Sequence, residues 1–183
     1  MSRKERRKLA KMAAKGKVGG QSAVFPATAT ALERQFNDSV AHFQAGRLKE
    51  AEAELSEIQR RQPDIPEVLH LMALIELQTG RPEAAAGHLE KAVARQPESA
   101  DLHNLLGGAL KRAGRLEEAV LAYDKAVSLG PELAEAHYNL GNALKELQRF
   151  DDAVPSYRRS VELEPGFADA HYNLGLVLMA AGR

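Results

Sequence analysis

Residues 134–147 read AEAHYNLGNALKEL, and the chain repeats this stretch at a fixed interval. The sixteen residues that begin at Ala134 align with the sixteen that begin at Ala168, and nine of these positions are identical. A fixed period indicates a repeat protein, in which one supersecondary unit stacks on the next. The period is 34 residues, and position one of the successive repeats is Leu32, Pro66, Ala100, Ala134 and Ala168.

Each repeat carries the signals of two helices joined by a short turn. Position sixteen is arginine in every repeat, and glycine precedes it in all but the fourth repeat, where Gln148 stands. Glycine ends a helix readily because it adopts the left-handed conformation at little cost. Position thirty-two of the four complete repeats is proline, which has no amide hydrogen and ends the second helix. The pattern predicts helices at residues 32–45, 48–61, 67–79, 82–95, 100–113, 116–129, 134–147, 150–163 and 168–181, and a local kink at Pro155.

Small and large residues alternate at fixed positions of the repeat. In the fourth repeat, position eight is Gly141, position twenty is Ala153 and position twenty-four is Tyr157. The other complete repeats carry a small residue, an alanine and a leucine or tyrosine at these positions. This pattern resembles the tetratricopeptide repeat (TPR) family over residues 32–183. The resemblance implies an all-α fold, a right-handed α-solenoid of antiparallel helix hairpins with about four and a half repeats.

The resemblance also divides the chain into segments. A basic, flexible N-terminal arm and linker covers residues 1–31, and the TPR repeats follow at 32–65, 66–99, 100–133, 134–167 and, with a first helix only, 168–183. The first twenty residues contain eight basic residues and one acidic residue, so they carry a net charge of +7 and the rest of the chain carries −7. We expect a solvated arm. Contact of residues 1–20 with nucleic acid or an anionic surface is the alternative.

The composition excludes several classes of function. The chain has no cysteine, so disulfides, thiol catalysis and thiolate metal sites are excluded. No apolar run approaches the ~20 residues of a membrane span, and no apolar region of a secretory signal follows the basic start. We therefore expect a cytoplasmic protein, and the family resemblance implies a bacterial one. Motifs of catalytic nucleophiles, phosphate loops and zinc proteases are missing, so we predict neither enzymatic activity nor a cofactor within this chain.

The candidate binding residues lie on the polar side of the first helices. In TPR proteins the first helices line an inner groove, so the resemblance implies that these side chains face a ligand. Asn37, Asn139 and Asn173 share position six, and Asn104 stands one place before it. This row resembles the groove of the protein O-linked N-acetylglucosamine transferases, where asparagines hold an extended peptide, since an amide both donates and accepts. The candidate peptide-binding residues are Asn37, Asn104, Asn139, Asn142, Asn173, Tyr138, Tyr172, Lys111 and Lys145.

Three observations weigh against particular sites. Leucine interrupts the asparagine row at position six of the second and third repeats. Position two is acidic in every repeat, which would repel the C-terminal carboxylate that chaperone adaptors of this family bind. His103, His137 and His171 recur at the repeat spacing, but equivalent helices lie on the order of 10 Å or more apart. That separation is too large for shared zinc ligands at about 2 Å, so we expect structural histidines and no metal.

The sequence therefore predicts a non-catalytic scaffold that binds a protein or an extended peptide segment in its groove. One alternative is that the chain is a substrate-recruiting fragment of a larger transferase, such as a glycosyltransferase, sulfotransferase or methyltransferase. The other is a homo-oligomeric scaffold that self-associates through the open final helix. On this final helix we expect an apolar patch that lacks a partner within the chain, formed by Leu174, Val177 and Leu178. An exposed apolar patch of this kind marks an interface.

Overall fold

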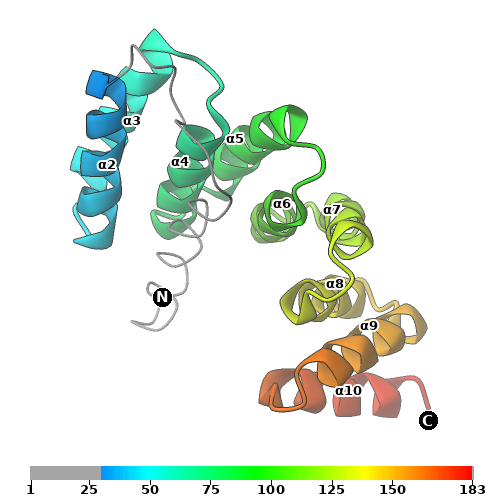
Figure 1. Cartoon of the computed structure of the whole chain (residues 1–183). Helices are drawn as coiled ribbons and strands as arrows, with labels where there is room; N and C mark the ends of the chain where they lie inside the picture. Colours follow the sequence, from blue (N-terminus) through cyan, green and yellow to red (C-terminus); the bar gives the residue numbers. More distant parts are fainter. Residues whose placement is uncertain (1–29, 183) are drawn as a thin grey trace. The chain divides into compact units, whose positions relative to one another are not determined.

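The structure is a computed structural model that describes residues 30–182 (Figure 1). The predicted N-terminal arm lies outside the described residues up to residue 29, and the first described helix already begins at Thr30. Within residues 30–182 the chain consists of helices and the turns between them. These residues fall into two compact units that divide after Arg95, and each unit is described by itself.

The first unit contains two helix hairpins. Its helices are α2 (Thr30–Gln44), α3 (Leu48–Arg61), α4 (Pro66–Gln78) and α5 (Pro82–Arg95). Each helix packs on the next along the chain from α2 to α5. The core between them is mostly aliphatic, with Leu55, Leu74 and Leu89 buried, and it includes one polar pair. The carboxylate of the nearly buried Glu76 lies 2.8 Å from Nδ1 of His88.

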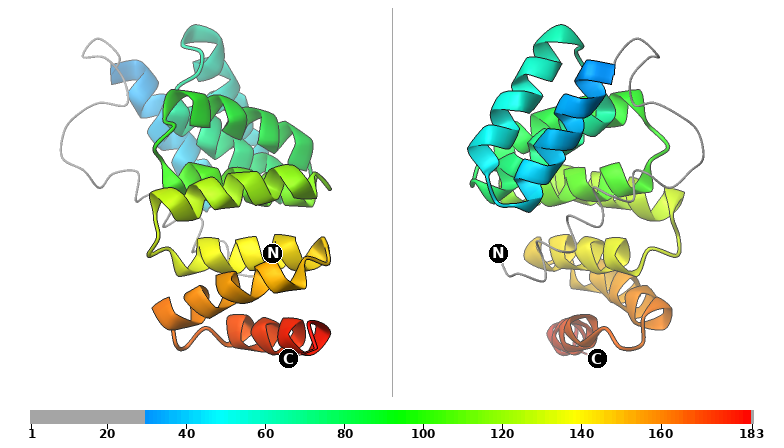
Figure 2. Two further views of the ribbon diagram at one scale, coloured as in Figure 1. Left: turned by 90° about the vertical axis from the view of Figure 1, so that its right-hand side faces the viewer. Right: turned by 60° about the vertical axis from the view of Figure 1, so that its left-hand side comes forward.

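The second unit contains two further hairpins and one additional helix (Figure 2). Its helices are α6 (Ala100–Arg112), α7 (Leu116–Leu129), α8 (Ala134–Glu146), α9 (Phe150–Leu163) and α10 (Ala168–Ala180). Again each helix packs on its successor. In both units the helices begin and end within two residues of the predicted positions, which confirms the all-α fold of consecutive hairpins.

The turns within the hairpins use the left-handed backbone conformation that the sequence predicts. Gly46, Gly80 and Gly114 follow the first helices of three repeats with φ of 77°, 79° and 82°. In the fourth repeat Gln148 takes the same conformation, with φ of 59°. A side chain at this φ is costly because the Cβ atom approaches the following carbonyl oxygen. The hairpin geometry therefore persists in the fourth repeat against the local preference of its residue.

Small residues at position eight let the second helix approach the first. A Cβ atom added to Gly107 would lie 2.7 Å from ring atoms of Tyr123, and one added to Gly141 would lie 2.9 Å from Cε1 of Tyr157. Both tyrosine rings are fully buried. Only glycine fits beneath a ring at this distance, since carbon atoms in contact normally lie about 3.5–4.0 Å apart.

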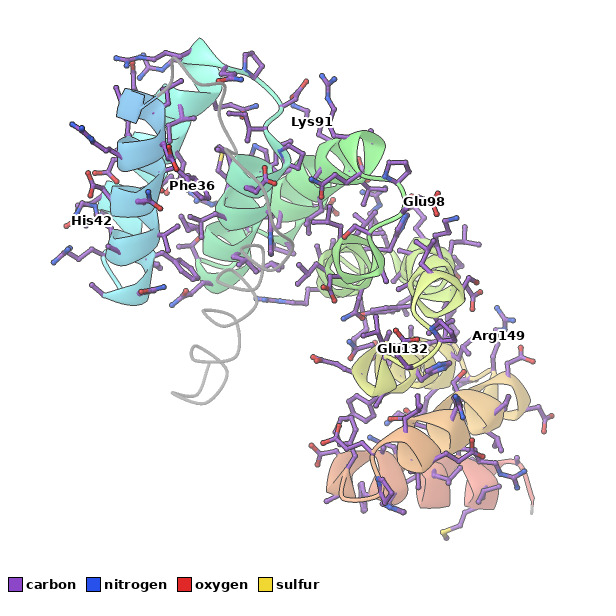
Figure 3. All side chains as sticks on the ribbon, in the orientation of Figure 1. Phe36, His42, Lys91, Glu98, Glu132 and Arg149 are labelled. Atoms are coloured by element: carbon purple, nitrogen blue, oxygen red, sulfur yellow. The ribbon has the colours of Figure 1, made fainter. Side chains whose placement is uncertain are left out.

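In the third and fourth repeats, arginine at position sixteen pairs with the first turn of the helix that follows it. Arg115 lies 2.6 Å from the carboxylate of Glu118, and Arg149 lies 2.7 Å from that of Asp152. Figure 3 shows Arg149 at the turn between α8 and α9. The hydrogen bond from Arg115 lowers the pKa of Glu118. Because both pairs are exposed to solvent, they add little to stability.

Helix α9 contains a proline in its interior. The helix runs without interruption from Phe150 to Leu163 through Pro155, whose ring is exposed. A proline at this point removes one backbone donor, and its position on the solvent side spares the buried face of the helix. The kink that the sequence predicts at Pro155 stays a prediction.

Candidate functional site

The first helices of the three repeats in the second unit form one layer. Helix α6 contacts α8, and α8 contacts α10, whereas the second helices α7 and α9 make at most marginal contact with each other. A stack whose first helices lie closer together than its second helices curves toward the first helices. The side of α6, α8 and α10 that faces away from α7 and α9 is therefore concave, and we call it the inner face.

Polar side chains join neighbouring first helices across the inner face. Three of the hydrogen bonds share a spacing of 35 residues, which is one repeat plus one residue. The three pairs are Asn139 Nδ2 to Asn104 Oδ1 at 3.0 Å, Asn173 Nδ2 to the Tyr138 hydroxyl at 3.2 Å, and Lys111 Nζ to the Glu146 carboxylate. In the first two pairs, position six donates to position five of the preceding repeat. The shared spacing means that all three contacts follow one stacking register.

Two of the candidate asparagines are largely committed to this stacking. Asn104 and Asn173 are buried. Besides its bond to Tyr138, Asn173 accepts a hydrogen bond from Lys145 Nζ through Oδ1 at 2.7 Å. Both ends of its carboxamide are therefore engaged within the second unit, which leaves little for a ligand to bind.

Asn139 and Asn142 retain hydrogen-bonding capacity on α8. The Tyr157 hydroxyl donates to Oδ1 of Asn142 at 2.7 Å, and burial raises the pKa of Tyr157, so the hydroxyl keeps its proton and remains the donor. The bond to Asn104 uses the amide nitrogen of Asn139. Within residues 30–182, Oδ1 of Asn139 and the amide nitrogen of Asn142 thus have no hydrogen-bonding partner. One acceptor and one donor remain, one helical turn apart.

Aromatic contacts fix the position of Tyr138, whose hydroxyl accepts a hydrogen bond on the inner face. The ring of Tyr138 lies 4.6 Å from that of Phe167 and 6.0 Å from that of Tyr157, measured between centroids. Both ring pairs are tilted, at 42° and 60°, an arrangement that aromatic pairs favour. These contacts hold the Tyr138 hydroxyl in the position where it accepts from Asn173.

The two ends of the inner face carry opposite charges. Each first helix begins with an acid at position two, as in Asp101 and Glu135, and α6 and α8 carry Lys111 and Lys145 in their last turns. These charges complement the helix dipoles. Because the first helices of successive repeats run in the same direction, the acids gather at one rim of the inner face and the lysines at the other. The ion pair between Glu146 and Lys111 partly neutralises the positive charge of the basic rim.

The structure brings most of the predicted binding residues together. Eight lie on the three first helices of the second unit: Asn104, Lys111, Tyr138, Asn139, Asn142, Lys145, Tyr172 and Asn173. Asn37 is exposed on α2 and belongs to the first unit. The sequence places Glu146 on the polar side of its helix but gives no sign that it pairs with Lys111, and the supporting roles of Phe167 and Tyr157 were missed. Complementary polar residues 35 positions apart would have identified Glu146.

The three recurrent histidines contact the turn that precedes their own helix. Nε2 of His103, His137 and His171 lies 2.9, 3.1 and 2.9 Å from the carbonyl oxygens of Pro97, Pro131 and Pro165. The same contact in three repeats supports a structural role for these rings. In the described part of the chain, no three side chains of the metal-ligating types are grouped to hold an ion. Nor is any helix among residues 30–182 both long and apolar enough to cross a membrane.

The exposed side of α10 differs from the prediction. Val177 was expected to lack a partner, but it is buried, and Leu174 and Leu178 are half-buried. These three residues face the rest of the unit because α10 packs on α9. The large apolar side chains that remain exposed on α10 are Tyr172, Leu176 and Met179.

Comparisons with known proteins agree with this architecture. A search of curated proteins finds no match. Among solved structures, "Crystal structure of MamA" matches with a TM-score of 0.76 and 24% identity over 79% of this chain and 84% of that one. "Crystal structure of YrrB: a TPR protein with an unusual peptide-binding site" matches with a TM-score of 0.74 and 22% identity over 87% of this chain and 86% of that one. At these identities the likeness concerns the fold.

The sequence itself also matches family models. One described as tetratricopeptide repeat covers residues 70–134, and one described as TPR repeat covers residues 141–182. Together the two matches include 107 of the 183 residues, from both units. The chain therefore belongs to the tetratricopeptide repeat family.

Proposed function

We propose that the chain is a non-catalytic scaffold that binds an extended peptide segment of a partner protein on the inner face of its second unit. Proteins of the TPR family bind protein and peptide partners, and YrrB, described as having a peptide-binding site, shares the fold. Fold alone does not define a function. The proposal therefore depends on the chemistry of α8.

The observation that carries the proposal is the pair of amides on α8. Asn139 retains an acceptor, Oδ1, and Asn142 retains a donor, its amide nitrogen, one helical turn away. An extended peptide presents amide hydrogens and carbonyl oxygens at similar intervals along its edge. The two asparagines can thus bind backbone groups of a segment without requiring a particular side chain. Their other ends are fixed by Asn104 and Tyr157, so little entropy is lost when the ligand binds.

The size and charge of the inner face determine the length and the charge pattern that we expect of the peptide. Adjacent packed helices lie about 8–10 Å apart, so α6 and α10 are separated by roughly 20 Å, the length of about six extended residues. The acidic rim includes Asp101 and Glu135, and the basic rim includes Lys111 and Lys145. Side chains of an extended segment alternate in direction. A segment whose alternate residues are basic and acidic would therefore satisfy both rims.

A peptide selection on the full chain tests this proposal. Displayed random peptides of about ten residues, enough to span the face, are selected for binding, and the affinity of the best peptide is measured for variants. We expect Asn139→Ala to raise Kd about 3- to 10-fold, the effect of losing one hydrogen bond of about 1 kcal/mol. The matched control is Asn104→Ala, which removes the same Asn139–Asn104 bond but leaves the Asn139 acceptor in place.

The control separates ligand binding from repeat stacking. If both variants weaken binding equally, the effect comes from the lost bond between α6 and α8 and the proposed acceptor role is wrong. If the selected peptides bind Asn139→Ala and the parent chain with the same affinity, the inner face of α8 is not the site. A role as recruiting segment of a larger transferase stays a prediction, and binding on this face is compatible with it.

A further inference from the structure

We propose that α6 contributes a place for one side chain of the bound peptide, in which an asparagine or glutamine carboxamide lies over Gly108 and accepts a hydrogen bond from the Tyr123 hydroxyl. We call this place, formed by Gly108 and the Tyr123 hydroxyl, the Gly108 site. The inference rests on the proposed peptide binding to the inner face and adds a side-chain preference to it. It follows from a difference between the third and fourth repeats, which are otherwise built alike.

In the fourth repeat, the tyrosine at position twenty-four bonds to an asparagine at position nine. Tyr157 is fully buried, and its hydroxyl donates to Oδ1 of Asn142 at 2.7 Å. The Asn142 side chain is half-buried on the inner face. Its carboxamide therefore covers the tyrosine hydroxyl from the inner face and gives it an acceptor.

The third repeat has the tyrosine but lacks the asparagine. Tyr123 occupies position twenty-four and is 1% exposed, whereas position nine is the half-buried Gly108. Within residues 30–182 the Tyr123 hydroxyl has no hydrogen-bonding partner. A Cβ atom added to Gly108 would lie 3.6 Å from this hydroxyl, and no other described atom beyond its chain neighbours and its own helix backbone would lie within 4 Å. The buried hydroxyl thus faces an open place where the fourth repeat has a carboxamide.

Close packing explains the glycine at position eight of α6 but not the glycine at position nine. At Gly107 an added Cβ atom would lie 2.7 Å from the ring of Tyr123, so no larger residue fits. At Gly108 the distance of 3.6 Å to the hydroxyl is an ordinary van der Waals contact, so a larger residue would fit. Glycine is unfavourable inside a helix. The structural consequence of this unfavourable residue is that the hydroxyl stays uncovered.

The group that fits the Gly108 site is a neutral hydrogen-bond acceptor. Burial raises the pKa of Tyr123, and the carboxylates of Glu146 and Glu135 raise it further, so the hydroxyl keeps its proton and donates. The same two carboxylates disfavour another carboxylate beside the hydroxyl. A carboxamide oxygen accepts the hydrogen bond without bringing a charge into the site. The chain itself contains this pairing, between Tyr157 and Asn142.

The Gly108 site and the two asparagines of α8 can bind one segment together. Asn104, four residues before Gly108 on α6, accepts a hydrogen bond from Asn139, which places the Asn139 carboxamide about one helical turn from Gly108. Packed helices lie about 8–10 Å apart, the length of about three extended residues. An extended segment can therefore place its carboxamide on α6 while its backbone groups reach Asn139 and Asn142.

Peptides selected on the parent chain test this preference. The enriched sequences should share one asparagine or glutamine. Replacing that residue by alanine in the best peptide should raise Kd about 3- to 10-fold, the effect of losing one hydrogen bond, and replacing it by the corresponding acid should raise Kd at least as much. Tyr123→Phe removes only the hydroxyl and should raise Kd for the carboxamide peptide by the same factor. It should not change Kd for the alanine peptide.

Gly108→Asn is the complementary test, because it supplies a carboxamide from the chain itself. The new side chain should bond to Tyr123 as Asn142 bonds to Tyr157, and should raise Kd for the carboxamide peptide about 3- to 10-fold. Gly87→Asn on α5 is the matched control, since Gly87 is also a half-buried glycine inside a helix and an added Cβ atom would meet nothing within 4 Å. It lies in the first unit and should leave Kd unchanged.

The Asn139→Ala variant separates this inference from the proposed function. If Asn139→Ala weakens binding but Tyr123→Phe does not, or if the enriched peptides lack a shared carboxamide or prefer a carboxylate, the Gly108 site is wrong and binding on the inner face stands. If Tyr123→Phe weakens the carboxamide and alanine peptides equally, the tyrosine acts through the fold, and the inference is again wrong. A selection that enriches no peptide, or a peptide that binds all variants alike, overturns both proposals. Circular dichroism checks that each variant stays folded.

Discussion

The glycine at position eight allows one substitution to be tested in two environments. Gly141 lies under the buried ring of Tyr157, whereas Gly175 faces open space. Both lie inside helices, where alanine is favoured over glycine by about 1 kcal/mol. We predict that Gly175→Ala stabilises the chain and that Gly141→Ala destabilises it, although the two positions are equivalent in sequence.

The magnitude follows from the contact that the new methyl group would make. At Gly141 the Cβ atom would lie 2.9 Å from Cε1 and 3.0 Å from Cδ1 of Tyr157. Carbon atoms pack at about 3.5–4.0 Å, so the ring or the helix must shift by at least about 0.5 Å. Overpacking of this kind costs about 1–3 kcal/mol, which exceeds the gain in helix propensity. Gly141→Ala should therefore lose about 1 kcal/mol, and Gly175→Ala should gain up to about 1 kcal/mol.

Urea denaturation followed by far-UV circular dichroism measures both changes. The midpoints are measured at two protein concentrations, so that any contribution of association to the stability is detected. The variants should move the unfolding midpoint in opposite directions, and the larger Gly141→Leu should unfold α8 to α10 altogether. If Gly141→Ala stabilises the chain as much as Gly175→Ala does, the close packing of Tyr157 on α8 is wrong.

Three further substitutions probe the same unit. Ser160 is fully buried and its hydroxyl has no hydrogen-bonding partner in the described structure, so Ser160→Ala should stabilise the chain by about 1–2 kcal/mol in urea denaturation; a loss of stability would indicate an unrecognised partner. Gln148→Gly should gain about 1 kcal/mol in the same assay, because glycine adopts the left-handed backbone of this turn without the cost that a side chain imposes; an unchanged unfolding midpoint would contradict this assignment of strain. Burial raises the pKa of Tyr123 and Tyr157 above that of the unfolded chain, so their contribution is complete below about pH 10 and is lost as the pH rises further. Tyr123→Phe should shift the alkaline unfolding midpoint, followed by circular dichroism, to higher pH, and an unchanged midpoint would contradict this linkage.

Most of the fold is predictable from the sequence because the signals are local. Glycine before position sixteen and proline at position thirty-two each act within one turn of a helix. Their regular recurrence placed the helix ends to within two residues. Gln148 stands where the other repeats have glycine, and it takes the same left-handed conformation. The repeat pattern therefore predicted the backbone of this turn better than the preference of glutamine itself.

The inner face was less predictable, because its hydrogen bonds depend on how the repeats stack. Alignment at exact multiples of 34 residues places Asn139 and Asn173 in one row. It does not reveal that Asn173 is occupied by Lys145 and Tyr138 while Asn139 retains an acceptor. The contacts follow a spacing of 35 residues, which reflects the offset between neighbouring first helices. A periodic sequence specifies the fold of each repeat, but the offset between neighbouring first helices arises from the packing of one repeat on the next.

The dependence on packing also explains why the prediction of an unpartnered apolar face on α10 was wrong. Its apolar residues at 174, 177 and 178 looked unpartnered because they resemble a helix face that awaits the next element, yet they are the face that packs within the unit. The surface that a further helix would occupy is marked instead by Gly175, since the two preceding repeats cover this position with a tyrosine. A small residue is an inconspicuous signal of an interface. In a repeat protein it becomes informative, because the other copies show what the small residue makes room for.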